Sequence, residues 1–154
     1  MSQRDGDAQI LEQFLRTMAP PAALTATYRQ RVVFASLDAR TQVLQRMTAN
    51  GWNALAVTSP VASDGKSLTA TNLAISLARE LHHTVLLVDM DLRNPSIHKY
   101  FGFEPAKGVG DCLLHGVALG DALVNPGIDR LVILPGRESI ENSSEILASP
   151  AMGR

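Results

Sequence analysis

The sequence predicts an α/β fold, in which helices flank a parallel sheet and a helical extension precedes the sheet domain. Apolar residues recur at helical spacing within residues 1–50 and again from residue 66 onward. A continuous apolar run at residues 84–88 is typical of a strand that is buried on both faces. The tripeptide Gly65-Lys66-Ser67 stands between a β-type run and the second helical pattern. Strand, loop, helix and strand in this order predict a βαβ unit with parallel strands and a right-handed crossover.

Composition narrows the class of protein. The 154 residues include 14 Lys and Arg against 15 Asp and Glu, so the net charge is −1 and gives no support for nucleic-acid binding. The longest apolar runs, such as Leu131–Leu134, are far shorter than the roughly 20 residues of a membrane span, so we expect no direct membrane insertion. The first residues lack the pattern of a signal peptide. The single cysteine, Cys112, excludes an internal disulfide and is expected to be a small buried hydrophobe. These features favour a cytoplasmic globular protein.

Residues 1–50 are predicted to form a helical extension, and residues 51–154 to form the sheet domain. A short helix with an apolar stripe at 10–18 is ended by two prolines. A second helix is expected from about Thr25 to Met47, closed by Asn50-Gly51. The extension either packs on the following domain or serves as an arm that binds a partner.

The first half of the sheet domain contains the predicted βαβ unit. Leu55–Thr58 is expected to be a strand, Ser59–Gly65 a loop, and Thr84–Val88 the second strand. The helix between them begins at Lys66. Its core-facing residues are expected to be Ala70, Leu73, Ala74, Leu77, Ala78 and Leu81.

The second half is predicted to add a third strand and two short helices. Arg130–Leu134 is the expected strand, and Asp111–His115 is a helix that Gly116 stops. Asn142, followed by Glu145 three residues later, fits a capping box that opens a last helix at Ile146–Met152.

Gly65-Lys66-Ser67 lies where a phosphate-binding loop must lie, at the start of a helix. The first amides of a helix have no intrahelical acceptor and favour an anion. In this interpretation Lys66 reaches the β- and γ-phosphates of ATP, and Ser67 ligates Mg²⁺. The position five before Gly65 is Pro60, where the full motif has glycine, and the alternative is an ordinary strand-to-helix turn. The residues expected to bind the nucleotide are Ser63, Asp64, Gly65, Lys66, Ser67 and Leu68.

Asp89 and Asp91 directly follow the second predicted strand. Residues two apart in an extended chain share a face, so both carboxylates point the same way. Parallel strands end at the same edge of a sheet, which brings this pair near the phosphate loop. The predicted metal ligands are therefore Ser67, Asp89 and Asp91, and the predicted catalytic residues are Lys66, Asp89 and Asp91. The alternative is that Asp89 caps the next segment and Asp91 pairs with Arg93.

Two other kinds of site receive less support. A dehydrogenase-type dinucleotide fold needs G-x-G-x-x-G at its first turn, and the sequence lacks it. His98 and His115 have no partner at metal-ligand spacing, so we expect them at the surface or at helix ends.

With these motifs in place, the sequence resembles the bacterial tyrosine autokinases of capsular and extracellular polysaccharide synthesis over about residues 53–152. The resemblance rests on ALAVTSPVASDGKSLTATNLAISLARE, TVLLVDMDLRNPSIHKYFG, GVGDCLLHG and LVILPGRESIENSSEILASP. It includes the phosphate loop without a first glycine and the segment V-D-x-D-x-R-x-P, Val88 to Pro95. The related septum-site and partition ATPases usually carry an additional lysine early in the loop, where this chain has Pro60-Val61-Ala62-Ser63.

The resemblance implies a P-loop fold, ATP and Mg²⁺ as cofactors, and phosphoryl transfer to tyrosine. It also implies a membrane-embedded polysaccharide chain-length regulator as partner, attachment to the inner membrane through that partner, and a homo-oligomeric ring. The alternatives are a non-catalytic nucleotide-binding regulator of a polysaccharide export complex and a partition-type ATPase.

The sequence departs from the family pattern in three places. It stops at Arg154, before the strand that in the family carries a further motif, an apolar run that ends in Asp. We therefore expect the C-terminal strands to be missing. It has no C-terminal tyrosine cluster, since its tyrosines are Tyr28 and Tyr100. The family's N-terminal E-x-x-R-x-x-R assembly motif keeps only Arg29. The sequence therefore predicts weak or no autophosphorylation.

Overall fold

The computed structural model describes residues 40–61, 64–79, 84–149 and 152. By internal contacts the chain divides into two compact units, Met1–Leu55 and Ala56–Arg154. In the first unit residues 40–50 are helical, and Gly51 follows in the left-handed conformation, with φ 66°. The amide of Gly51 donates to the Thr48 carbonyl, which closes the helix where the sequence predicts. The predicted helix at 10–18 and the start of the second lie outside the described residues.

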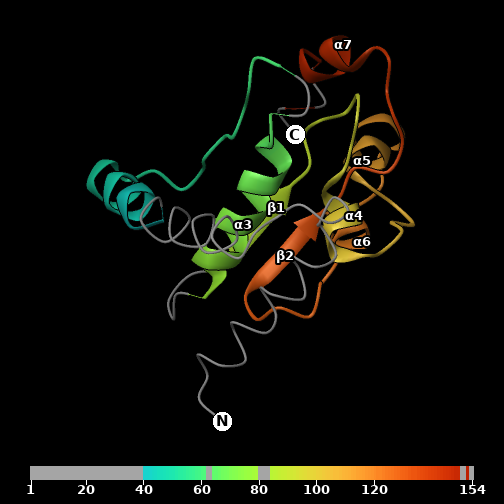
Figure 1. Ribbon diagram of the computed structural model, residues 1–154. Coiled ribbons are helices and arrows are strands. Elements are labelled where there is room, and N and C mark those ends of the chain that lie inside the picture. Colours follow the sequence, from blue (N-terminus) through green and yellow to red (C-terminus); the bar gives the residue numbers. More distant parts are fainter. Residues whose placement is uncertain (1–39, 62–63, 80–83, 150–151, 153–154) are drawn as a thin grey trace, which may run out of the picture. The chain divides into compact units, whose positions relative to one another are not determined.

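The second unit is built on two parallel strands, β1 (Val85–Val88) and β2 (Leu131–Leu134) (Figure 1). In their register, Val85 is opposite Leu131 and Val88 is opposite Leu134. The amide of Asp89 continues the ladder by donating to the Leu134 carbonyl at 3.0 Å. Both strands therefore end at one edge of the sheet, and the segments that follow them start side by side.

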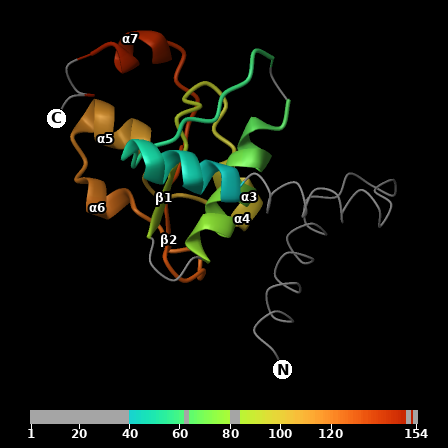
Figure 2. The same ribbon diagram turned by 90° about the vertical axis from the view of Figure 1, so that its left-hand side faces the viewer.

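Helices lie on both sides of this strand pair. Figure 2 shows α3 and α4 to one side of the strands and α5 and α6 to the other. The helices of this unit are α3 (Lys66–Ala78), α4 (Ile97–Phe101), α5 (Val109–His115), α6 (Leu119–Ala122) and α7 (Ser143–Leu147). Parallel strands flanked by helices confirm the predicted α/β class. Of the helices that the structure describes, none has the length and hydrophobicity of a membrane span.

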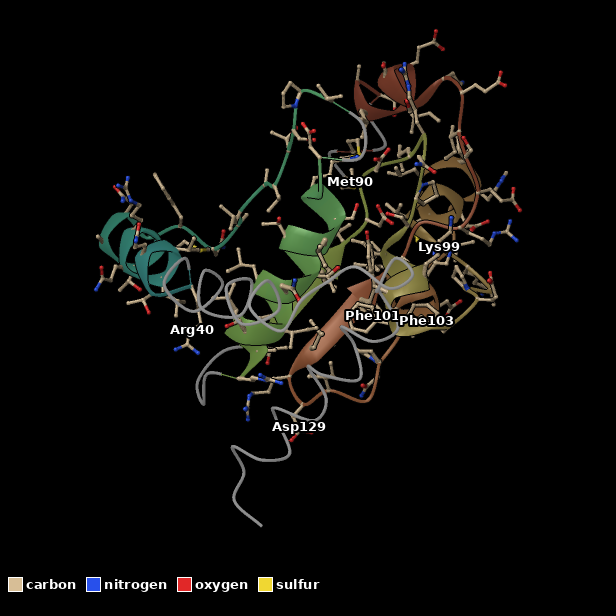
Figure 3. The ribbon with its side chains drawn as sticks, in the orientation of Figure 1. Arg40, Met90, Lys99, Phe101, Phe103 and Asp129 are labelled. Carbon is tan, nitrogen blue, oxygen red and sulfur yellow. The ribbon has the colours of Figure 1, made fainter. Side chains whose placement is uncertain are left out.

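Two apolar clusters hold the unit together. The first joins α3, α4 and both strands, and Phe101 and Phe103, labelled in Figure 3, pack against it. Its buried members are Ala74, Ile75, Ala78, Leu87, Ile97, Leu131 and Ile133. The second cluster lies around α5, α6 and α7, with Leu92, Val109, Ala122, Leu134 and Ile146 as its buried members. Cys112 is half-buried at the second cluster, so its predicted packing role holds only in part.

The expected strand at Leu55–Thr58 is wrong. Among the described residues the sheet contains β1 and β2 alone, and Leu55 and Val57 expose 49% and 36% of their surface. A β-type run becomes a strand only where a neighbour accepts its backbone hydrogen bonds, and this segment has no such pairing. The expected three-stranded sheet is therefore a two-stranded one. β1 is not buried on both faces either, since Leu86 is 48% exposed.

The helices differ from prediction in which face they bury and where they start. Helix α3 buries Ala74 and Ala78 as predicted, but it also buries Thr71, Asn72 and Ser76. The other predicted core residues, Ala70, Leu73 and Leu77, are half-buried, and Leu81 lies outside the described residues. The last helix is Ser143–Leu147, where Ile146–Met152 was expected. Asn142 is its N-cap, but no side-chain capping bond forms, so the predicted capping box is wrong. The predicted strands at 84–88 and 130–134 and the helix at 111–115 agree with the structure within two residues, whereas α4 and α6 were not predicted.

Candidate functional site

The candidate site is built around the start of α3. Gly65 is the N-cap and adopts φ +83°, a left-handed conformation that strains residues with a Cβ. No side chain caps this helix, and the first intrahelical bond runs from the Thr69 amide to the Gly65 carbonyl at 2.8 Å. The amides of Gly65 to Leu68 precede the intrahelical ladder and point out of the helix end. They form a positively polarised helix start that can bind an anion.

Lys66 extends from this helix start to the segment that follows β1. Its Nζ lies 2.6 Å from Oδ2 of Asp91, and the two side chains are 29% and 21% exposed. Asp91 also accepts a bond from the Asn94 amide at 3.1 Å through Oδ1. The ion pair therefore links the start of α3 directly to the segment that follows β1. The alternative pairing of Asp91 with Arg93 is wrong, because Nε of Arg93 donates to Oγ of Ser143 instead.

The electrostatics of this pair agree with its geometry. The hydrogen bond with Asp91 raises the pKa of Lys66 above its ordinary value, although burial opposes the shift. For Asp91, burial acts to raise the pKa, but the hydrogen bonds from Lys66 and from the Asn94 amide outweigh it and lower the pKa. Both shifts favour the charged forms, so the pair is ionised near neutral pH.

Asp89 has a different environment from Asp91. It is 2% exposed. Its Oδ2 accepts the amides of Ser96 at 2.8 Å and Ile97 at 2.9 Å, and its Oδ1 accepts the Asp91 amide at 3.3 Å. The carboxylate thus caps the start of α4, which is the alternative role that the sequence left open for it. Oδ1 accepts a single amide and keeps a lone pair for a further ligand.

A hydroxyl contact closes the site between the two helices. Oγ of Ser96, at the N-cap of α4, donates to Oγ of Ser67, in the first turn of α3, at 3.1 Å. This side of α3 continues into buried polar groups, because Oγ1 of Thr71 and Oδ1 of Asn72 are buried without a hydrogen-bond partner. The polar side of α3 therefore begins at the phosphate loop and runs inward.

The structure brings most of the predicted site residues together. Lys66 contacts Asp91, while Ser67 and Asp89 both bond Ser96. Asp64 is exposed, Leu68 is half-buried in the first turn of α3, and Ser63 lies outside the described residues. The available donors are hydroxyl and carboxylate oxygens, the ligand type that Mg²⁺ prefers, and they lie beside one ammonium group. This set of donors fits a magnesium nucleotide.

Two residues of the site were missed by sequence reasoning. Ser96 is 29 positions from Ser67, its partner, and no spacing rule connects them. Gly136, after β2, lies against the same segment: a Cβ built there would be 2.4 Å from Cβ of Pro95 and 3.6 Å from Cγ of Asp89. The only signal for Gly136 is its place after a predicted strand, at the edge where ligands of parallel sheets bind.

The remaining candidates lie away from this site. His98 is buried, so it is not a surface histidine, but it lies at a helix end, in the first turn of α4; His115 is exposed at the end of α5 as predicted. Within the described ranges, no three His, Cys, Asp or Glu side chains gather as a metal cluster. A hollow of about 280 Å³ lies between α5 and residues 137–142, apart from Lys66 and Asp91. It is open to solvent and contains none of the predicted site residues.

The relatives found by comparison with known proteins are named tyrosine-protein kinases. No protein-family model matches the chain. It is 28% identical to the tyrosine-protein kinase YwqD of Bacillus subtilis over 156 aligned residues, which span 99% of this chain and 61% of the relative. It is 35% identical to the tyrosine-protein kinase CpsD of Streptococcus agalactiae over 94 residues, 60% of this chain and 41% of the relative. The chain therefore spans less than two thirds of the length of these relatives.

Solved structures give the same result. The tyrosine kinase domain of BceF superposes with a TM-score of 0.69 at 28% identity, over 78% of this chain and 47% of that one. The kinase domain of VpsO superposes with a TM-score of 0.66 at 26% identity, over 82% of this chain and 63% of that one. These likenesses confirm the predicted resemblance and the fold class.

Proposed function

We propose that this chain, a relative of the bacterial tyrosine-protein kinases, binds ATP with Mg²⁺ at the start of α3. The observation that carries the proposal is the convergence of three segments on one point. Lys66 of the phosphate loop contacts Asp91 at 2.6 Å, and Ser67 of the same loop contacts Ser96 at 3.1 Å. A glycine in the left-handed conformation and an uncapped helix start complete the arrangement.

Each residue has a defined part in this proposal. The amides of Gly65 to Leu68 would donate to phosphate oxygens, and Lys66 would exchange the Asp91 carboxylate for a phosphate. Ser67 and Asp91 would hold Mg²⁺ through oxygen, and Asp89 would contribute its remaining lone pair or anchor the segment. When bound, the magnesium nucleotide supplies a γ-phosphoryl group for transfer. Ser63 and Asp64 would complete the loop around the phosphates.

At the level of biological activity, we propose a tyrosine-protein kinase-type regulator of exopolysaccharide or capsule synthesis. Both relatives are named tyrosine-protein kinases, which supports a kinase-type activity over that of a partition-type ATPase. A non-catalytic nucleotide-binding regulator is the second candidate. The engagement of Asp89 with three backbone amides favours it, because these bonds occupy lone pairs of the carboxylate that a metal ion would need.

The proposal includes a partner. As the family resemblance implies, we propose that a membrane-embedded polysaccharide chain-length regulator brings the chain to the inner membrane, and that copies of the chain associate. Co-expression with such a regulator should move the chain from the soluble to the membrane fraction. Binding to protein-free liposomes would argue against this part of the proposal.

Nucleotide binding is tested by calorimetric titration of ADP in the presence of Mg²⁺. Lys66→Ala removes a charge-assisted contact of about 1.5–3 kcal/mol, so the affinity should fall roughly ten- to a hundredfold. Lys99→Ala is the matched control, since Lys99 is exposed on α4 (Figure 3) and should leave the affinity unchanged. Equal affinities of the wild type and Lys66→Ala would contradict the proposed site.

The same preparations separate the two candidate activities. Incubation with labelled ATP should give phosphotyrosine that is absent in Lys66→Ala if the chain is a kinase. Nucleotide binding without any phosphotyrosine on the chain or on a supplied tyrosine substrate would favour the non-catalytic regulator.

A further inference from the structure

Ser96 departs from the ordinary behaviour of a serine at a helix N-cap. A serine in this position usually accepts a bond from an amide of the first turn through its own side chain. At the start of α4 no side-chain capping bond forms. The Ser96 hydroxyl instead donates to Oγ of Ser67, in a different helix, at 3.1 Å.

The Asp89 carboxylate performs the capping in its place. Its Oδ2 accepts the amides of Ser96 at 2.8 Å and Ile97 at 2.9 Å, which are the first amides of α4. Asp89 is buried, and the segment before Ser96 is held close to Gly136, where a Cβ would collide with Pro95. The backbone of Ser96 is therefore fixed independently of its side chain, and its hydroxyl is available to donate a hydrogen bond to Ser67.

We propose that Ser96 is a positioning residue for the hydroxyl of Ser67, and that Asp89 acts through Ser96. This inference rests on the proposed function, in which Ser67 ligates Mg²⁺. A serine oxygen has two lone pairs and one proton. When the Ser96 hydroxyl occupies one lone pair of Ser67, it restricts the rotation of the Ser67 hydroxyl and leaves one lone pair for a metal ion. Without Ser96, the Ser67 hydroxyl rotates among its staggered positions.

This role differs in a measurable way from a structural one. A residue that only stabilises α4 would affect nucleotide binding equally with and without Mg²⁺. A residue that orients a metal ligand affects the binding that Mg²⁺ adds. The ratio of ADP affinities with and without Mg²⁺ therefore separates the two roles.

The test compares two variants of the full chain with nearly the same shape, Ser96→Thr and Ser96→Val. Threonine keeps the hydroxyl and valine replaces it by a methyl group, so both carry the same branching at Cβ. ADP is titrated by calorimetry with Mg²⁺ and with a chelator. We expect Ser96→Val to lower the Mg²⁺-dependent gain in affinity about two- to tenfold, the size of one neutral hydrogen bond. We expect Ser96→Thr to retain the gain and both variants to bind metal-free ADP equally.

Ser149→Ala is the matched control. Oγ of Ser149 also makes one hydrogen bond, to the Ile146 carbonyl at 2.7 Å, but at the end of α7. Its removal should leave the Mg²⁺ ratio unchanged. A Ser96→Val protein with the wild-type ratio, or one that loses affinity equally with and without Mg²⁺, would overturn the inference. A wild-type chain that binds no ADP at all would instead overturn the proposed function, and the inference with it.

Discussion

Lys66 can pair with two anions, the Asp91 carboxylate and the phosphate that we propose it binds. In the structure Nζ of Lys66 lies 2.6 Å from Oδ2 of Asp91. Because both side chains are partly exposed, water screens the pair and its net contribution to stability is at most about 1 kcal/mol. A phosphate with two negative charges can therefore displace Asp91 from Lys66 at modest cost. Asp91 would then be free to take part in holding Mg²⁺.

The pKa shifts of this pair predict a pH dependence of stability. The pKa of Asp91 is lowered on folding, so the ion pair stabilises the fold above the unfolded value of about 3.9 and is lost as the pH falls through the folded value. The pKa of Lys66 is raised, so at the alkaline end the stabilisation persists until the pH rises above about 10.4. We expect Asp91→Asn to unfold with a free energy up to about 1 kcal/mol lower than the wild type between roughly pH 5 and 9. This difference should shrink below about pH 4.

Urea unfolding across this pH range measures the difference. Asparagine keeps an oxygen that can accept the Asn94 amide, so the variant isolates the contact with Lys66. Asp121→Asn is the control, because its ion pair with Lys107 spans 3.3 Å between exposed side chains and should contribute nothing measurable. Parallel curves for the wild type and Asp91→Asn down to pH 3 would contradict the assigned roles.

For single residues, the sequence predicted which candidate side chains lie near one another better than it predicted their individual contacts. Lys66 contacts Asp91 as expected, and Ser67 lies beside it in the first turn of α3, because the helical spacing that begins at Lys66 already placed this local motif at a helix start. The capping role of Asp89 appeared only as an alternative. The contact of Ser96 with Ser67 could not be predicted, because it depends on how α4 packs against α3.

Helices α3 and α4 and the segment after β2 set the geometry of the site at the scale of elements. Gly136 follows β2 and leaves room for Pro95, which precedes α4. This close approach places the segment before α4 beside the end of β2, while the bonds of Asp89 to the Ser96 and Ile97 amides hold the start of α4 at the end of β1. The glycine therefore contributes to the site without supplying any functional group.

Gly136→Ala should destabilise the fold and weaken ADP binding together. The added Cβ would lie 2.4 Å from Cβ of Pro95, a rigid ring atom, so the segment that carries Ser96 must move. We expect a loss of about 1–3 kcal/mol in the free energy of unfolding. Gly120→Ala is the matched control, because a Cβ there meets no atom within 4 Å and its φ is not positive. Helix propensity predicts a gain of at most about 1 kcal/mol for that variant.

Thermal unfolding and ADP titration of the two alanine variants measure both effects. If Gly136→Ala matched Gly120→Ala in stability and affinity, the close packing of Pro95 against the β2 segment would have no part in the site.

The elements themselves were predicted with uneven success. The runs at 84–88 and 130–134 became β1 and β2, because continuous β-branched and leucine residues favour a paired strand. Leu55–Thr58 has a similar composition and is not a strand, since pairing depends on distant segments that composition does not reveal. On α3, spacing favoured a stripe of leucines and alanines, whereas the structure buries Thr71, Asn72 and Ser76 beside Ala74 and Ala78.

At the scale of the second unit, the candidate site occupies the carboxyl edge of two parallel strands. Asp89 and Asp91 follow β1, Gly136 follows β2, and α3 presents its start to the same place. Binding at this edge is general for open parallel sheets, because several loops and helix starts meet there. The class of fold, and the edge of the sheet at which the candidate residues lie, were therefore predictable from the order of elements. The number of paired strands was not.

A crystal structure of the chain with ADP and Mg²⁺ would show whether the start of α3 binds the phosphates of a magnesium nucleotide, as we propose. We expect the β-phosphate within hydrogen-bond distance of the amides of Gly65 to Leu68, with Nζ of Lys66 on the phosphate and released from Asp91. We expect Mg²⁺ bound by Ser67 Oγ, with Asp91 or its bound water beside it. ADP bound elsewhere on the chain, or an intact contact between Lys66 and Asp91 with nucleotide present, would contradict the claim.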